Sequence, residues 1–203
     1  MKKNAGLIAA LLGVVLNFSL CLTKIFIGIS SNSLAIYCDA INNLGDSFAC
    51  VIALLGFALV KKQTERQRIR TQSLFTNYIS VFIAVTGIYF VYNGIERMMY
   101  PLPVSYAVRY AVTLAVTIVI KFLMGIMFRA FNKKEGSPVL SALSLDSFLD
   151  CFVTLAALMS LVLVEKVNYA VDGLFAIITG SIITVSAIKN IIKESKALII
   201  DEE

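Results

Sequence analysis

Six long apolar segments, separated by short polar links, constrain the fold of this chain more than any other feature. Each segment exceeds the roughly 20 apolar residues that a helix needs to cross the hydrocarbon core of a bilayer. The apolar runs are continuous and do not alternate, so they predict helices and not the strands of a membrane β-barrel. The expected spans are residues 5–29, 34–60, 74–98, 104–131, 139–164 and 169–192.

The fold class that follows is an all-α membrane protein, with six transmembrane helices in one domain over residues 1–203. Only 15% of the residues are charged, against about 25% in soluble domains. The chain has no His, which excludes Ser-His-Asp and Cys-His catalysis and His-ligated zinc or haem. We therefore expect neither an enzyme nor a prosthetic group.

Basic residues gather on one side of the six-span arrangement and predict its orientation. Thirteen of the 18 Lys and Arg lie on that side, and Arg97, Arg109 and Lys166 on the other. By the positive-inside rule both termini are cytoplasmic, in a plasma or inner membrane. The net charge of +5 needs no nucleic-acid partner to explain it. The thirteen are Lys2, Lys3, Lys61, Lys62, Arg66, Arg68, Arg70, Arg129, Lys133, Lys134, Lys189, Lys193 and Lys196.

Two of the polar stretches carry further expectations. Residues 61–71 are expected to form a basic loop between the second and third spans. The basic N-terminus resembles that of a signal peptide, but the apolar run that follows is too long and lacks a small-residue cleavage site. We expect an uncleaved first span.

Besides Asp172, which lies near the start of the sixth span, four Asp lie inside the predicted spans, where a carboxylate costs several kcal/mol unless it is paired, hydrated or bound to a cation. Asp39 and Asp46 belong to the second span, and Asp146 and Asp150 to the fifth. Spacings of three, four and seven residues place Asp39, Asn42, Asn43 and Asp46 on one helical stripe. Asp146 and Asp150 form a second stripe. The two stripes can face each other and wrap a cation in oxygen ligands.

Structural explanations compete with a cation site. Asp39 lies near the start of its span, where it can cap the helix or support the ligands from outside. Lys24 and Lys121 also lie within spans and can compensate one or two of the acids, but not all four. The four Cys lie in apolar segments without a CxxC motif, which indicates packing and not a disulfide framework.

The second and fifth spans are weakly similar to each other. Ser33 precedes Asp46 by thirteen residues, and Ser137 precedes Asp150 by the same interval. This alignment sets the pair Asn42 and Asp46 against the pair Asp146 and Asp150. Transporters often place their sites between such related elements.

These motifs resemble those of the cation diffusion facilitator family, the divalent-metal exporters. Residues 31–46 read SNSLAIYCDAINNLGD and are similar to the second-span pattern S-x-S-L-A-x-x-x-D-A-x-H-x-x-x-D. Residues 143–150 read LSLDSFLD and resemble the fifth-span motif, with Asp146 at its His-or-Asp position. The sixth span, from Asp172-Gly173 to Glu194-Ser195, also fits the family pattern.

The resemblance implies a metal site between the second and fifth spans, alternating access, exchange for protons and a homodimer in the lipid bilayer. Carried over position by position, the metal ligands are Asn42, Asp46, Asp146 and Asp150. Asp39 and Asn43 are expected to support these ligands or the access route. The family's soluble C-terminal domain and its His-rich second link are missing from this sequence, so cytosolic metal sensing is not expected.

One amide and three carboxylates make an all-oxygen ligand set, which suits harder cations than the His and Cys ligands of zinc sites. Combined with the resemblance, this favours Mn²⁺ first, Fe²⁺ second and Zn²⁺ third. Efflux as the direction rests on the resemblance alone. Other interpretations stay open: a non-transporting membrane scaffold or subunit, a carrier of Na⁺ or H⁺, and, least of all, an intramembrane aspartyl protease.

Overall fold

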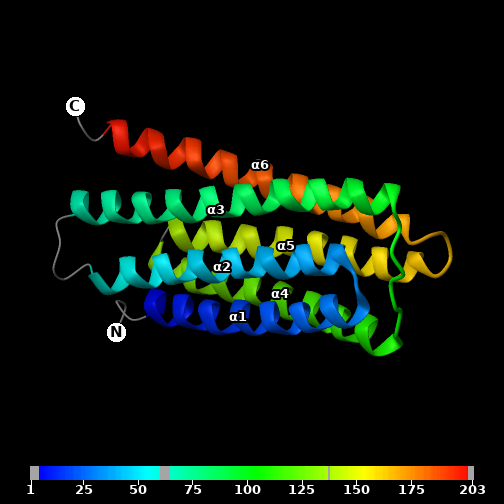
Figure 1. Cartoon of the computed structure of the whole chain (residues 1–203). Helices are drawn as coiled ribbons and strands as arrows, with labels where there is room; N and C mark the ends of the chain where they lie inside the picture. Colours follow the sequence, from blue (N-terminus) through cyan, green and yellow to red (C-terminus); the bar gives the residue numbers. More distant parts are fainter. Residues whose placement is uncertain (1–4, 60–64, 137, 201–203) are drawn as a thin grey trace.

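A computed structural model describes residues 5–59, 65–136 and 138–200 (Figure 1). All regular secondary structure in these residues is α-helical, and six helices are long and apolar enough to cross a membrane. This confirms the expected fold class. The helices are α1 (Ala5–Ser31), α2 (Leu34–Leu59), α3 (Glu65–Met99), α4 (Val108–Glu135), α5 (Pro138–Val164) and α6 (Ala170–Ile200).

Some helix boundaries differ from the predicted spans. The expectation of a loop over 61–71 was wrong from Glu65 onward, because α3 begins there, nine residues before the predicted span. Glu, Arg and Gln in this stretch are good helix formers, so the helix continues past the apolar segment. α6 likewise continues to Ile200. The predicted end of the second span at Val60, with Lys61 and Lys62, lies outside the described residues, as do Lys2, Lys3 and Ser137.

The start of α4 is also later than predicted, at Val108 in place of Val104. Pro101 and Pro103 precede it, and the residue before a proline is biased toward extended backbone. Residues 101–107 therefore form a non-helical link. Val104 in this link is buried against α4 and α5 residues such as Leu114 and Leu161, so the link packs on the bundle.

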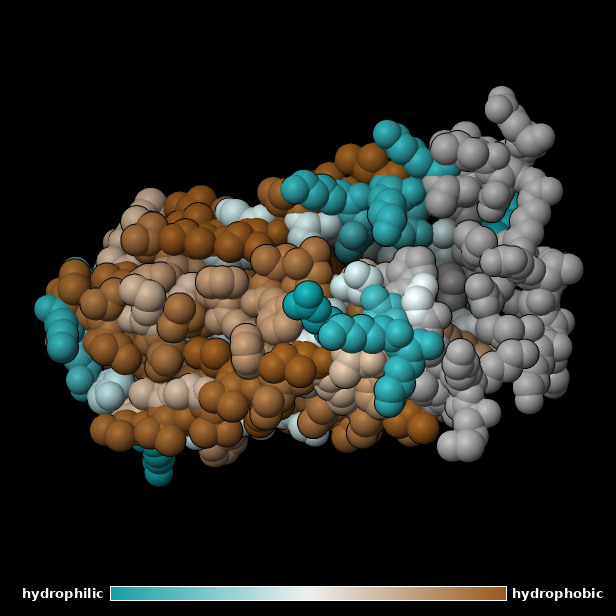
Figure 2. Space-filling model, turned by 180° about the vertical axis from the view of Figure 1, so that it is seen from behind, coloured by the Kyte–Doolittle hydropathy of each residue, from teal (hydrophilic) through white to brown (hydrophobic). Residues whose placement is uncertain are grey.

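The helices run up and down, so that α1 begins and α6 ends at the same end of the bundle (Figure 1). This end is called the basic end, because the described residues Arg70, Arg129, Lys133, Lys134, Lys193 and Lys196 lie in the helix segments that reach it. The other end is called the opposite end and carries Arg97, Arg109 and Lys166. The space-filling view shows a largely apolar surface along the middle of the bundle, with hydrophilic side chains at the opposite end and in a patch nearer the basic end, as expected of a surface that faces lipid (Figure 2).

Helices α3 and α6 pack as a close pair along one side of the molecule (Figure 1). Two glycines seven residues apart on each helix allow this approach. A Cβ atom at Gly173 would lie 2.6 Å from the carbonyl oxygen of Gly94, and one at Gly87 would lie 3.0 Å from that of Gly180. Small residues of this kind let backbones approach closely in membrane helix pairs.

Asp172 of α6 fixes the opposite end of the bundle. Its carboxylate accepts hydrogen bonds from the Ser33 hydroxyl at 2.5 Å and from the backbone N–H of Leu34 at 2.7 Å, and so caps the start of α2. Arg97 of α3 pairs with the same carboxylate at 3.3 Å, and Ser160 of α5 donates to it at 3.1 Å. One buried acid thus joins four helices near the ends of α2 and α6.

Candidate metal centre

Three carboxylates from α2 and α5 meet inside the bundle. Asp46, Asp146 and Asp150 each offer an oxygen, and these oxygens all lie within 4.8 Å of one another. Asp46 and Asp150 are buried and Asp146 is half-buried. The two stripes predicted from residue spacing do face each other. These three residues are called the acid cluster below.

Lys121 of α4 inserts its ammonium into the acid cluster. Its Nζ lies 2.7 Å from Oδ2 of Asp46 and 2.5 Å from Oδ2 of Asp150. The side chain is fully buried, at 0% exposure. A buried ammonium is costly unless it is paired. Here the two carboxylates provide the opposite charge and the hydrogen-bond acceptors that replace water.

Asn42 stands at the edge of the same cluster. Its side-chain N–H donates to Oδ1 of Asp150 at 2.7 Å. The sequence predicted coordination through the amide oxygen, whereas the amide nitrogen faces the carboxylate in this structure. A half-turn of the amide group exchanges the two atoms, so Asn42 can present either a donor or an acceptor to the cluster.

A second buried charge pair lies two helical turns away, toward the opposite end. Nζ of Lys24 in α1 lies 2.8 Å from Oδ2 of Asp39. Lys24 also donates to the hydroxyl of Thr154 at 2.7 Å, and that hydroxyl donates to Oδ1 of Asp39 at 3.3 Å. All three side chains are fully buried. These three residues are called the Lys24 triad.

Asp39 and Asn43 therefore lie outside the acid cluster. Asp39 belongs to the Lys24 triad, and the side-chain N–H of Asn43 donates to the backbone carbonyl of Asp39 at 3.0 Å. Thr154, the third member of the triad, was not predicted from the sequence. The sequence does carry a signal for Thr154, because this residue follows Asp150 by four positions and lies on the same helical face.

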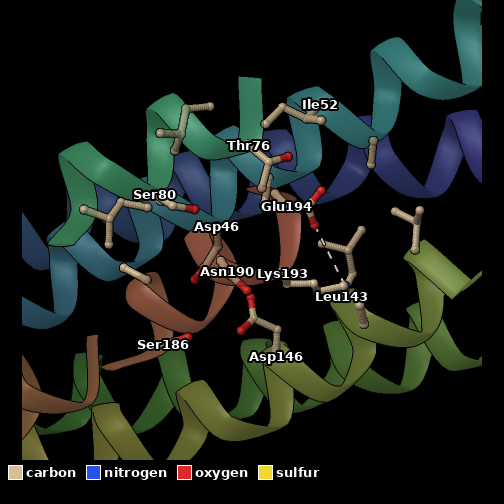
Figure 3. A pocket seen from close by; sticks show the side chains of 18 of the residues that line it. Asp46, Ile52, Thr76, Ser80, Leu143, Asp146, Ser186, Asn190, Lys193 and Glu194 are labelled. Carbon is tan, nitrogen blue, oxygen red and sulfur yellow. Dashed lines mark ion pairs between the residues drawn. The ribbon is translucent and has the colours of Figure 1, made fainter. Parts of the chain in front are cut away.

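A cavity of about 440 Å³ connects the acid cluster with the basic end. Asn42, Asp46 and Asp146 line its deep part, and Ser73 of α3 with Lys193 and Glu194 of α6 line the part near the basic end. Figure 3 shows Asp46 and Asp146 facing the same space from α2 and α5. No residue of the Lys24 triad lines this cavity.

Polar contacts between α3 and α6 shape the outer part of this cavity. The Ser73 hydroxyl donates to Oε2 of Glu194 at 2.7 Å, and the side-chain N–H of Asn77 donates to the Ser195 hydroxyl at 2.9 Å. In the sequence, Glu194 and Ser195 are marked only by the motif at the end of the sixth span. On each of these helices, polar residues four apart lie on one face. They are Ser73 and Asn77 on α3, and Asn190 and Glu194 on α6.

The comparisons with known proteins define the class of this molecule. A model of the cation efflux transmembrane domain matches residues 10–199. The chain therefore belongs to the cation efflux family, also called the cation diffusion facilitators, whose members transport divalent metal ions across membranes and are not enzymes. This confirms the resemblance seen in the motifs. A search of curated proteins finds no match.

The Lys24 triad generates a prediction about stability. Removing one partner of a buried ion pair leaves an uncompensated charge and costs about 3–5 kcal/mol. We expect Asp39→Leu to lower the thermal midpoint of the detergent-solubilised protein strongly. The double variant Lys24→Met with Asp39→Leu should regain most of the loss, because no buried charge is left unpaired.

The measurement is circular dichroism at 222 nm on heating, since the chain has no Trp to report unfolding. Lys166→Met at the exposed opposite end serves as the control for charge removal. An Asp39→Leu variant that melts with the wild type would show that the pair does not stabilise the bundle.

Proposed function

We propose that this chain exports a divalent cation, Mn²⁺ in the first place, in exchange for protons, with Asn42, Asp46, Asp146 and Asp150 as its ligands. The observation that carries the proposal is the acid cluster at the deep end of a cavity inside a six-helix bundle of the cation efflux family. The chain acts as one membrane domain, as a homodimer in the cell membrane.

The ligand chemistry supports a hard cation. The cluster offers carboxylate oxygens from three residues and an amide group from Asn42. No Cys belongs to the cluster among the described residues, and Cys50 instead accepts a hydrogen bond from Asn17. Oxygen ligands suit Mn²⁺ over softer ions. Fe²⁺ and Zn²⁺ follow as less favoured substrates.

The cavity supports alternating access. It leads from the basic end, which the positive-inside rule assigns to the cytoplasm, together with both termini. Beyond the acid cluster, the fully buried Lys24 triad separates the site from the opposite end. These features support a carrier that is open toward the cytoplasm, and transport then requires the helices to part on the side of the triad.

Carboxylates also provide the exchange with protons. A chain without His has no imidazole to take up protons near neutral pH. The carboxyl groups that bind the metal are then the groups that protons compete for. Metal binding displaces protons from them, and protonation from the opposite end releases the metal.

Transport by reconstituted protein tests this function. Wild-type protein in liposomes should move Mn²⁺ in the presence of a proton gradient, and Asp46→Ala or Asp150→Ala should abolish the flux, because each removes a charged ligand. Glu165→Gln, an exposed acid at the opposite end, is the matched control and should transport normally. Normal flux in both Asp variants would contradict the site, and no flux of any divalent ion through the wild type would favour a scaffold.

The Asn42 position tests how the metal is selected. Asn42→His replaces an oxygen ligand by an imidazole nitrogen, which zinc prefers. We expect the ratio of Zn²⁺ to Mn²⁺ transport to rise by about tenfold. Asn42→Gln, which keeps the amide, should change the ratio little. Unchanged selectivity in Asn42→His would show that this position does not contact the metal.

A further inference from the structure

The ammonium of Lys121 contacts two of the proposed metal ligands. Its ammonium contacts one oxygen of Asp46 and one oxygen of Asp150, at 2.7 and 2.5 Å. The other oxygen of Asp150 accepts the Asn42 N–H at 2.7 Å. Both oxygens of Asp150 therefore already have an N–H donor before any metal arrives.

A metal ion and the ammonium cannot share these oxygens without strong repulsion. Small divalent ions such as Mg²⁺ and Zn²⁺ bind oxygen ligands at about 2.0–2.2 Å. An ion bonded to Oδ2 of Asp150 would thus lie less than about 5 Å from Nζ of Lys121, with no room for screening water in a fully buried position. The like charges would repel each other across that short distance.

Lys121 differs from the other buried lysine in this respect. Lys24 pairs with Asp39 and Thr154, which lie outside the acid cluster. Neither of them lines the cavity, whereas Asp46, one of the two partners of Lys121, does. Lys121 alone among the described cations pairs with two members of the acid cluster. Its flexible four-carbon stem allows the ammonium to withdraw from a carboxylate without moving α4.

We propose that Lys121 is a tethered competitor of the transported metal: its ammonium takes the cation's place between Asp46 and Asp150 in the empty carrier, and metal binding displaces it. The proposal rests on the proposed function and adds a residue that sets metal affinity. An internal cation keeps the carboxylates from standing unpaired when the site is empty. It also weakens metal binding enough for the ion to leave once the helices have opened the site to the other side of the membrane.

Titration of Mn²⁺ into the purified full-length chain in detergent tests this role, by calorimetry at fixed pH and ionic strength. Lys121→Met removes the competing charge but keeps an unbranched side chain of similar length. We expect its Kd for Mn²⁺ to fall by about tenfold or more. Lys121→Arg keeps the charge and can hold a carboxylate at two points, so its Kd should equal or exceed that of the wild type.

Transport gives a second readout that a merely structural role would not move. In liposomes, Lys121→Met should show a lower KM for Mn²⁺ together with a lower kcat, because a metal bound more tightly leaves more slowly. Lys166→Met, an exposed lysine at the opposite end, should leave the Kd, KM and kcat unchanged.

The outcomes separate this proposal from the function on which it rests. A Lys121→Met variant that is folded and binds Mn²⁺ as weakly as the wild type, or more weakly, would overturn the competitor role while leaving the metal site intact. Failure of both proteins to bind Mn²⁺ or any divalent ion tested would contradict the proposed function itself.

Loss of Lys121 also leaves two carboxylates without their partner, so the variant can fail to fold in the absence of metal. Recovery of folded Lys121→Met only when Mn²⁺ is present supports the proposal, since the metal then replaces the ammonium. If it folds under neither condition, Lys121→Gln takes its place, and a Kd for Mn²⁺ that is not lower than that of the wild type would overturn the proposal.

Discussion

Carboxylates at membrane depth need positive charge, and the arrangement of this molecule follows from that requirement. Four buried or half-buried Asp lie on α2 and α5, and the bundle brings a buried Lys from α1 and another from α4 to meet them. A lone charge there would cost several kcal/mol. The two networks differ in one respect, since two members of the acid cluster, Asp46 and Asp146, line a cavity and no residue of the Lys24 triad does.

We therefore assign the Lys24 triad to the stability of the bundle, and we propose that the acid cluster exchanges its ammonium for a metal ion. The Lys24 triad is satisfied by a protein ammonium and a hydroxyl, and it is closed off from the cavity. The acid cluster has three acids for one ammonium and a cavity that leads to the basic end. Asp172 joins the helices at the opposite end, and the glycines allow α3 and α6 to pack closely.

Much of the fold could be predicted because its signals are local. Apolar length defines the six spans, and helical spacing places Asp46, Asp146 and Asp150 on stripes. Lys24 and Lys121 could be named as partners of the acids from the sequence. Which acid each lysine contacts could not be predicted, because the rotation of α1 and α4 against α2 and α5 depends on packing between helices. The cavity-lining residues of α3 and α6 could not be predicted for the same reason. In the sequence, Ser73 and Asn190 are isolated polar residues, and only the pairing of the two helices brings them to one cavity.

The most direct test of the central claim is to locate the metal. Crystals of the full chain grown with Mn²⁺ should show an anomalous difference peak at the manganese edge within about 2.2 Å of oxygens from Asp46, Asp146 and Asp150. The Lys121 ammonium should then lie away from Asp150. A peak elsewhere in the bundle, or none at saturating Mn²⁺, would contradict a metal site built from these three carboxylates.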